Sequence, residues 1–320
     1  MKGVGFATGV IVLLLTFCSI ALDDVWFFDV LASLRLQIVV GSAVLAGVAL
    51  IFRKWYAAGL LTGAVLVNAA LMAPPFQHPG PAPGARSDLS MVFFNSAQNT
   101  LQLFPLLEFV KERQPDLLVF TEVFRWDIDN LRQTFSGYPH SVGEPGVFGA
   151  VVLSRAPIAD FRVHRHAAGP SGRTLEVRLC GNGGNRCAAL LVLHPTPPLN
   201  GDFRDWRNDH IANATAYAKI VASEGMIDGR VIMAGDFNLT PWNRLYMAAL
   251  EASGFADAFQ SRLPHSTWFS SFAVIGLPID HIWTGPGVGV VDTAIGPPSG
   301  SDHLPIHAAF ELGFEPGSGG

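Results

Sequence analysis

The first quarter of the chain is a series of apolar runs separated by short polar connections. Residues 4–22, 36–52 and 57–73 contain no charged side chain, and these runs are 19, 17 and 17 residues long. A helix needs about 20 apolar residues to cross a bilayer. Three such runs in succession are too many for one soluble core to bury. The pattern therefore predicts three transmembrane helices, which make residues 1–73 a membrane anchor.

Charged residues between the apolar runs predict the orientation of this anchor. The basic residues are Lys2, Arg53 and Lys54, whereas the first connection carries Asp23, Asp24 and Asp29 beside Arg35. Basic connections favour the cytoplasmic side. The chain after Ala73 is therefore predicted to lie on the non-cytoplasmic side, periplasmic or extracellular, of a multi-pass inner-membrane protein. A cleavable signal peptide in place of the first helix is the alternative, and it leaves the domain on the same side.

The remainder of the chain alternates strand-like and helix-like segments. Residues 74–88 are rich in Pro and Gly and predict a linker, residues 89–314 form a predicted domain, and residues 315–320 form a flexible tail. Strand-like runs lie at 90–95, 116–123, 149–154, 174–179, 188–194, 230–238, 280–283 and 304–312, and helix-like runs lie at 101–114, 209–224 and 242–253. Several strands are apolar throughout, which indicates burial on both faces. The pattern predicts an α/β fold with two sheets packed inside and helices outside.

Two cysteines give an independent indication of the compartment. Cys180 and Cys187 flank the segment GNGGNR, which separates two strand-like runs. This arrangement predicts a β-hairpin in which the two thiols face each other, and hence a disulfide. A disulfide is typical of an oxidising compartment, in agreement with the charge pattern. The alternative is a chance placement of two thiols.

Polar side chains occur repeatedly where the predicted strands end. In the segment GDFN, Asp236 and Asn238 are two positions apart, so in a strand they would share one face. A turn explains one such pair. Other strand ends carry further polar groups, namely Asn95, Glu122, His194, Asp280, Asp302 and His303. So many chemically active side chains at strand ends predict loops that converge on one edge of the sheets, as functional loops on a rigid scaffold do.

These segments resemble the endonuclease/exonuclease/phosphatase superfamily, which is deoxyribonuclease I-like. The motifs occur in the family's order: FTEV at 120–123, LVLHPTP around His194, GDFN at 235–238, IDHIW at 279–283 and SDHLPI at 301–306. The resemblance covers about residues 89–312 and suggests a membrane-anchored, bacterial-type member. It implies a four-layer α/β sandwich, with two packed mixed sheets flanked by helices, that hydrolyses phosphate esters.

The resemblance also implies a divalent metal centre. Glu122 matches the acidic metal ligand, Asn95 matches the asparagine that helps to hold the centre, and Asp302 matches a residue near the metal. Oxygen ligands of this kind suit hard cations. The expected cofactor is Mg²⁺, with Mn²⁺ as a substitute.

Five further residues match catalytic positions of the family. The resemblance implies that Asp236 positions or deprotonates the attacking water, or assists the leaving group, and that Asn238 binds the phosphoryl oxygens. His194 is expected to contact the scissile phosphate. Asp280 is expected to orient His303, which acts either as a base or as a cationic phosphate ligand.

Other polar residues carry weaker predictions. Arg173 is a candidate phosphate ligand, with a surface ion pair as the alternative. Asn99 is a candidate because it is near Asn95. His265, His281 and His307 are interpreted as structural.

Charge bears on the substrate. Residues 85–320 contain 17 Lys and Arg against 23 Asp and Glu, whereas a nucleic-acid-binding protein usually has a basic stripe. A small patch formed by Arg162, Arg165, Arg204 and Arg207 is the exception. The sequence therefore favours a small or lipid-linked phosphoester, such as a lipid headgroup, over DNA or RNA. A membrane-anchored nuclease is the alternative. A non-catalytic binding protein is disfavoured because Glu122 and His303 are retained.

Overall fold

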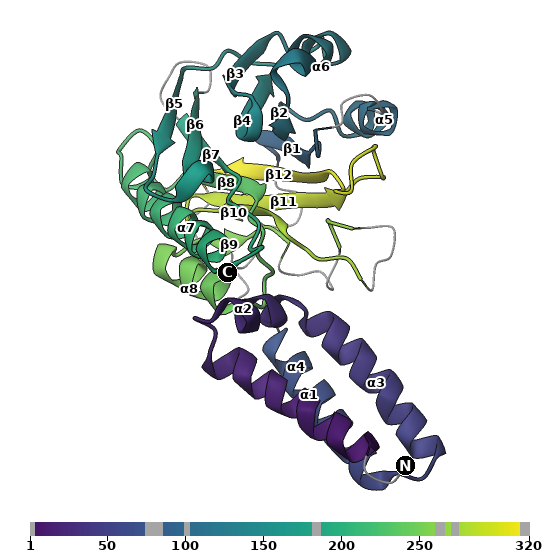
Figure 1. The fold of residues 1–320 in the computed structure, drawn as a ribbon. Helices are drawn as coiled ribbons and strands as arrows, with labels where there is room; N and C mark the ends of the chain where they lie inside the picture. The colour runs from purple at the N-terminus through teal and green to yellow at the C-terminus, as the bar shows by residue number, and fades with distance from the viewer. Residues whose placement is uncertain are drawn as a thin grey trace.

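The computed structural model describes residues 4–73, 86–98, 103–180, 187–259, 266–269 and 275–313. Most of the predicted linker, the predicted tail, Asn99 and His265 lie outside these residues. Four helices come first: α1 (Val4–Ala21), α2 (Trp26–Ser33), α3 (Arg35–Ile51) and α4 (Trp55–Leu71). Helices α1, α3 and α4 form an elongated bundle that points away from the rest of the molecule, and α2 lies across the near end of the bundle (Figure 1).

The apolar runs are helical, but their lengths do not establish three membrane spans. Among the described residues, α1 is the one helix that is long and apolar enough by itself to cross a membrane, and its N-terminal position also suits a signal sequence. Helices α2 and α3 qualify together but are bent by 69° at their junction, and α4 has 17 residues. Helix α2 was not predicted, because its Asp29 and its polar flanks read as a connection.

A network of polar side chains connects α1, α3 and α4 at the end of the bundle nearest the sheets. The Nη1 group of Arg35 donates to Oδ1 of Asn68 at 3.1 Å and to Oγ of Ser19 at 3.4 Å. The Nδ2 group of Asn68 donates to Oγ1 of Thr16 at 3.0 Å. These side chains are buried. Because α1, α3 and α4 each contribute to the network, it fixes their relative positions.

Two six-stranded sheets follow the bundle. The first has the order β11 (Val288–Ile295), β12 (Ile306–Leu312), β1 (Leu89–Asn95), β2 (Leu117–Val123), β4 (Gly146–Ser154), β3 (His140–Glu144). The second has the order β5 (Asp160–Arg165), β6 (Arg173–Cys180), β7 (Cys187–Leu193), β8 (Val231–Asp236), β10 (Asp280–Thr284), β9 (Ala256–Asp257). Each sheet is mixed, because the pairs β1–β2 and β7–β8 are parallel and the other pairs are antiparallel.

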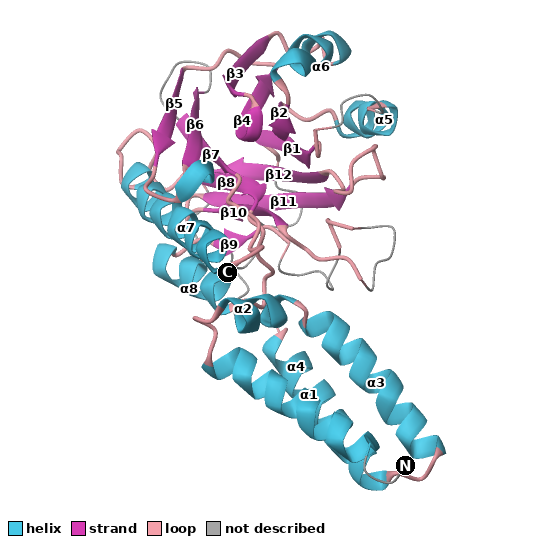
Figure 2. Cartoon of the chain, viewed as in Figure 1, coloured by secondary structure: helices cyan, strands magenta, loops and turns pink. Residues whose placement is uncertain are grey.

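Apolar side chains on both faces of each sheet produce four layers. In β1, Met91 and Phe93 face the second sheet, whereas Val92 and Phe94 pack against α5 (Phe104–Arg113) and α6 (Ile128–Thr134). The outer face of the second sheet packs against α7 (Gly201–Ala222) and α8 (Arg244–Ser253). Figure 2 shows helices on both outer faces of the paired sheets. The predicted two packed mixed sheets flanked by helices are therefore confirmed.

Several elements differ from those predicted. Helix α7 begins eight residues before the predicted start because Oδ1 of Asn200 caps it by accepting from the Phe203 amide at 2.9 Å. Strand β8 ends at Asp236, so Asn238 is not in a strand. Besides α2, the unpredicted elements are β3, β5, β9, β11, α6 and the short 3-10 helices Arg125–Asp127 and Gly169–Ser171. Strands β3 and β5 are edge strands, and edge strands need less apolar sequence because one side is solvated.

A disulfide joins Cys180 and Cys187, which are paired residues of neighbouring strands β6 and β7. Replacing both by Ala in the full chain should lower the free energy of unfolding by about 2 kcal/mol, because the bond restricts the unfolded chain over a short loop. Denaturant unfolding measures this loss. The matched control is Cys18→Ala, which removes a free thiol. Equal stability of the double variant and the control would contradict the expectation.

Candidate active site

The two parallel strand pairs bring four polar residues to one edge of the sandwich. Neighbouring parallel strands end at the same edge of a sheet. Strands β1 and β2 therefore place Asn95 beside Glu122, and strands β7 and β8 place His194 beside Asp236. The Nδ2 group of Asn95 donates to Oδ2 of Asp236 at 3.0 Å, which joins the two sheets at this point.

The strands that pair antiparallel with β1 and β8 complete the cluster, because they begin at the edge where β1 and β8 end. Strand β10 begins with Asp280, which pairs with Asp236 at the end of β8. His303 precedes β12, the antiparallel neighbour of β1. The hydroxyl of Ser301 donates to the carbonyl oxygen of Asn95 at 2.8 Å and accepts from the His303 amide at 3.0 Å. The structure thus brings six of the predicted residues together.

Each residue of the segment GDFN has a structural role. A Cβ atom on Gly235 would lie 1.9 Å from the carbonyl oxygen of Leu193, so only glycine allows β8 to approach β7 this closely. Phe237 is buried against the outer helices. Asn238 has a φ of +50°, and its amide donates to Oδ1 of Asp236 at 2.9 Å. The segment is therefore a turn stabilised by the Asp236 side chain as well as part of the cluster.

Glu122 enters the site through a bulge in β2. The pairing of β2 with β4 shifts between Thr121 and Val123, and Glu122 has a φ of +55°. Left-handed backbone is costly for a residue other than glycine, and bulges redirect a side chain. Without the bulge, the two-residue period of the strand would set the direction of Glu122. This local distortion points the carboxylate at the cluster.

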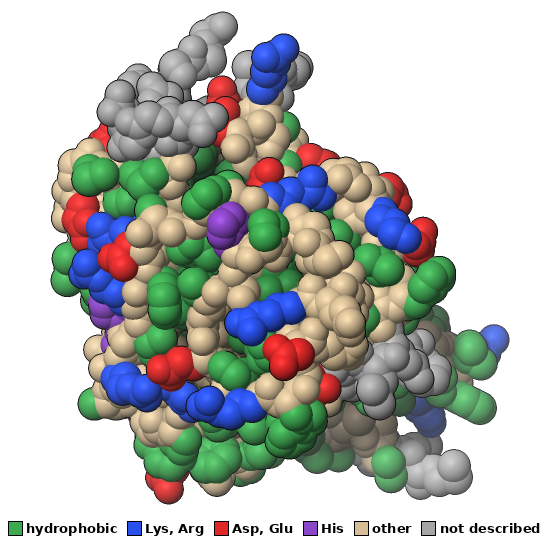
Figure 3. All heavy atoms as spheres, turned by 90° about the horizontal axis from the view of Figure 1, so that it is seen from above, with side chains coloured by type: hydrophobic (Ala, Val, Ile, Leu, Met, Phe, Trp, Pro, Cys, Tyr) green, Lys and Arg blue, Asp and Glu red, His purple; other side chains and the backbone are tan. Residues whose placement is uncertain are grey.

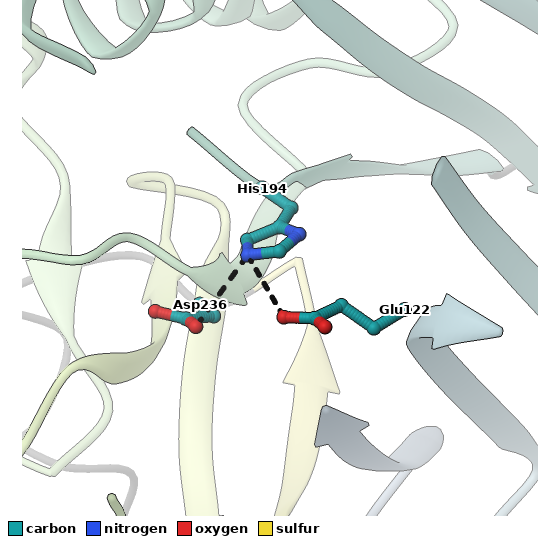
Figure 4. A group of neighbouring side chains, drawn as sticks. All are labelled: Glu122, His194 and Asp236. Carbon is teal, nitrogen blue, oxygen red and sulfur yellow. Dashed lines mark ion pairs between the residues drawn. The ribbon is translucent and has the colours of Figure 1, made fainter. Parts of the chain in front are cut away.

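Three side chains form a group that could hold a metal ion (Figure 4). The Nε2 atom of His194 lies 3.5 Å from Oε1 of Glu122 and 3.6 Å from Oδ2 of Asp236. The other ring nitrogen, Nδ1, donates to the carbonyl oxygen of Val147 at 2.9 Å. A carbonyl can only accept, so Nδ1 carries a proton, and Nε2 is the ring nitrogen that faces the carboxylates.

This donor set fits a divalent cation. Carboxylate oxygens suit Mg²⁺ or Mn²⁺, and an imidazole nitrogen is a better ligand for Mn²⁺ or other transition metals. The separations of 3.5 and 3.6 Å are too long for good hydrogen bonds. They are of the size expected when ligand atoms each lie about 2.1 Å from one shared ion. Glu122, His194 and Asp236 are therefore the residues that would hold the metal.

Amide side chains hold the carboxylates of this group in place. Besides binding Asp236, Asn95 donates to Oε1 of Glu122 at 3.1 Å, while its Oδ1 accepts from the Ala97 amide at 2.9 Å. Its nitrogen rather than its oxygen thus faces the carboxylates. Gln98, which the sequence did not single out, donates to Oε2 of Glu122 at 3.2 Å. Its one signal in the sequence is its position three residues after Asn95.

A second group that could hold a metal contains Asp236, Asp280 and His303. The Nδ1 group of His303 donates to both carboxylate oxygens of Asp280, at 2.9 and 3.0 Å, and its Nε2 lies 3.6 Å from Oδ2 of Asp236. The backbone amide of Asp280 in turn donates to Oγ1 of Thr267 at 3.1 Å. Asp280 therefore orients the ring, as the resemblance implies.

Burial and charge shift the pKa values of this second group. Burial and the negative charge of Asp280 raise the pKa of Asp236 to about 6, against the lowering effects of His303, His194 and the Asn238 amide. Burial disfavours the charged form of His303, but the attraction and hydrogen bond of Asp280, together with Asp236 and Asp302, raise the pKa of His303 to about 10. The ring is therefore a cation at neutral pH.

Other candidate residues lie outside the two groups. Asp302 is half-exposed and accepts from Nε1 of Trp268 at 2.8 Å, and its Oδ1 lies 4.0 Å from Nε2 of His303. Arg173 lies 3.5 Å from Oε2 of Glu144, the ion pair that was its alternative. His281 and His307 are buried.

The predicted patch of four arginines does not form an open basic surface. Arg207 is fully buried in an ion pair with Asp29. The other three arginines lie in ion pairs with Asp160, Glu144 and Asp205. Pairing leaves this region without the excess positive charge that a phosphate backbone requires.

The Asp280–His303 pair yields a measurable prediction. In Asp280→Asn, the pKa of His303 should fall by more than one unit, because burial is then opposed by fewer negative charges. NMR titration of the ring measures this fall. In the unmodified chain the pair stabilises the fold fully below pH 6.5, and this contribution is lost as pH rises through about 10. An unchanged pKa in the variant would contradict the assigned cause.

Comparisons with known proteins agree with this fold. The profile of the Endonuclease/Exonuclease/phosphatase family matches residues 86–303. A search of curated proteins returned no match. Similar solved structures include an endonuclease/exonuclease/phosphatase from Beutenbergia cavernae, with 18% identity, a TM-score of 0.57 and coverage of 71% of this chain and 72% of that one.

Two further similar structures have stated activities. A mannosyl-6-phosphatase from Bacteroides thetaiotaomicron has 15% identity and a TM-score of 0.57, and the match covers 70% of this chain and all of that one. A 3′ phosphatase from Neisseria, bound to a product DNA hairpin, has 18% identity, the same TM-score and the same coverage. Identities this low show a shared fold. Together with the match over 86–303, they show that the chain belongs to the endonuclease/exonuclease/phosphatase family.

Proposed function

We propose that this chain is a divalent-metal-dependent phosphoester hydrolase that is anchored in a membrane and acts on a small or lipid-linked phosphoester outside the cytoplasm. The observation that carries the proposal is the convergence on Asp236 of two imidazoles and a second carboxylate, Glu122, from separate segments of the chain. Carboxylates that share a site repel each other, so such a cluster indicates a function rather than a means of stability.

Each residue of the cluster has a proposed part in the attack of water on phosphorus. Asp236 accepts the proton of the attacking water through a carboxylate that Asn95 and the Asn238 amide hold in place. Asn238 uses one N–H to donate to the carbonyl oxygen of Pro195 at 3.0 Å. Its second N–H is left as a donor to a phosphoryl oxygen.

His303 is proposed to stabilise negative charge on the phosphoryl group. Asp280 takes the hydrogen bond from Nδ1, which leaves Nε2–H as a fixed donor at the edge where the substrate binds. Because the ring and its partner are preorganised, no reorientation is needed as charge develops. A metal held by Glu122, His194 and Asp236 would add positive charge beside the same phosphate.

The distribution of charge supports a substrate other than a long nucleic acid. Acidic and basic side chains are interspersed on the face shown in Figure 3, and the described arginines of the predicted patch are paired with carboxylates. A nuclease remains the second candidate, because the similar Neisseria enzyme holds DNA. For a nucleic acid, loss of affinity with added salt should be steep.

Exposed apolar side chains support the proposed membrane anchor. Along the bundle, the exposed large apolar residues include Phe6, Ile11, Leu14, Phe17, Val44, Leu45, Val48 and Leu66. An apolar surface of this extent would be costly in water. The disulfide at Cys180 is consistent with an oxidising compartment and supports a non-cytoplasmic position for the domain.

Loss of a metal ligand or of the cationic ring should abolish hydrolysis. In the full chain, Glu122→Gln and His303→Ala should each lower kcat for a generic phosphodiester, with Mn²⁺ or Mg²⁺ present, by about 10²-fold or more. The thermal midpoint of Glu122→Gln should not fall, since the substitution removes repulsion between carboxylates. The matched controls are Glu108→Gln and His140→Ala on other elements. Full activity of Glu122→Gln would contradict the role assigned to Glu122, whereas absence of hydrolysis by the parent chain with any metal would favour a binding protein.

Substrate class can be tested with the same enzyme on a panel. Turnover of phosphodiester headgroups in lipid vesicles or of small phosphodiesters should exceed that of duplex DNA by about tenfold or more. Hydrolysis of the small substrates should change little with salt, because few counterions are displaced. If DNA is cleaved faster and its binding weakens steeply with salt, the nuclease assignment replaces this one.

A further inference from the structure

The N-terminal segment is joined to the catalytic domain by a buried ion pair. The Nη2 group of Arg207, on α7, lies 2.8 Å from Oδ2 of Asp29, on α2, and both side chains are almost fully buried. The other carboxylate oxygen of Asp29 accepts from Nδ2 of Asn243 at 3.0 Å. Asn243 caps the N-terminus of α8. One carboxylate from α2 thus binds both α7 and the start of α8.

The same arginine also contacts the candidate active site. Its Nη1 group donates to the carbonyl oxygen of Asn238 at 3.2 Å. Asn238 is the residue with left-handed backbone that follows Asp236. Its amide and its side chain are held by Asp236 and by the Pro195 carbonyl. Arg207 thus supplies the third hydrogen bond that maintains this unfavourable conformation.

Helix α2 also contacts the far end of the turn formed by residues 237–243. The indole Nε1 of Trp242 donates to the carbonyl oxygen of Ser33 at 3.0 Å. The segment 237–243 is therefore held through Asn238 at its beginning and through Trp242 and Asn243 at its end. Residues 26–33 precede the region 86–303 that matches the family. The support for the turn comes from outside the matched domain.

We propose that Asp29 and Arg207 are positioning residues for the hydrolytic site, so that the docked helix α2 holds the turn 237–243 in its working conformation. The proposal rests on the proposed function of that site. Removal of Asp29 would leave the Arg207 charge buried without its carboxylate, and the guanidinium would turn to another partner. Asn238 and Asp236 would then lose their fixed geometry, which lowers the rate more than it weakens substrate binding.

The test uses the full chain in detergent micelles with Asp29→Asn, which keeps the size of the side chain but removes its charge. We expect kcat for a small phosphodiester to fall about tenfold or more with KM within twofold. In the metal-free protein, exchange of the backbone amide hydrogens should become at least about tenfold faster in residues 237–243 and stay unchanged in β10. The matched control, Asp23→Asn, removes the exposed ion pair with Arg244 at the same junction and should match the parent chain in both measurements.

Each outcome decides the proposal. Parent values of kcat and of exchange in a folded Asp29→Asn chain would overturn it. If Asp29→Asn does not fold, Trp242→Phe replaces it, because this change removes the hydrogen bond to Ser33 and keeps an aromatic ring; a fall in kcat supports the proposal and an unchanged kcat overturns it. If the parent chain hydrolyses no phosphoester, the proposed function fails, and the exchange of 237–243 decides the positioning role alone.

Discussion

Burial of the Asp236 carboxylate is the constraint on which the site depends. An ionised carboxylate removed from water is stable only when surrounding groups compensate its charge. Asn95, the Asn238 amide and the imidazoles of His194 and His303 do so from four different segments. Their positions are thereby tied to one another. Glu122 and Asp280 add negative charge, so a cation held beside Asp236 would be stabilised more strongly than one at the half-exposed Asp302.

The backbone pays for this arrangement at two positions. Glu122 and Asn238 both have left-handed backbone, which costs about 1–3 kcal/mol at each residue. Around Asn238 the cost is offset by hydrogen bonds from three directions. At Glu122 the bulge in β2 and the amides of Asn95 and Gln98 serve the same purpose. Left-handed backbone thus occurs at two residues whose side chains are aimed into the site.

The N-terminal helices are part of the folded unit rather than a loose tether. Buried charge at Asp29 and Arg207 joins α2 to the domain. Trp26 adds a hydrogen bond to the carbonyl oxygen of Pro198, in the loop before α7, and Gln37 donates to the carbonyl oxygens of Ile275 and Gly276. In the proposed membrane setting, these contacts would hold the catalytic edge at one orientation to the lipid surface instead of leaving it to rotate on a linker.

The sequence by itself determined the layers of the fold and most of the site. Fully apolar strands required burial on both faces. The strand ends carried Asn95, Glu122, His194 and Asp236 in the family's order. Both features could be predicted because they depend on neighbours along the chain. Tertiary structure decided what depends on distant partners: Gln98 and the Val147 carbonyl join the site, Arg207 is buried instead of lying in a basic patch, and Asp29 pairs with it. A polar residue's role is set by the group it meets, and its sequence neighbours do not reveal that group.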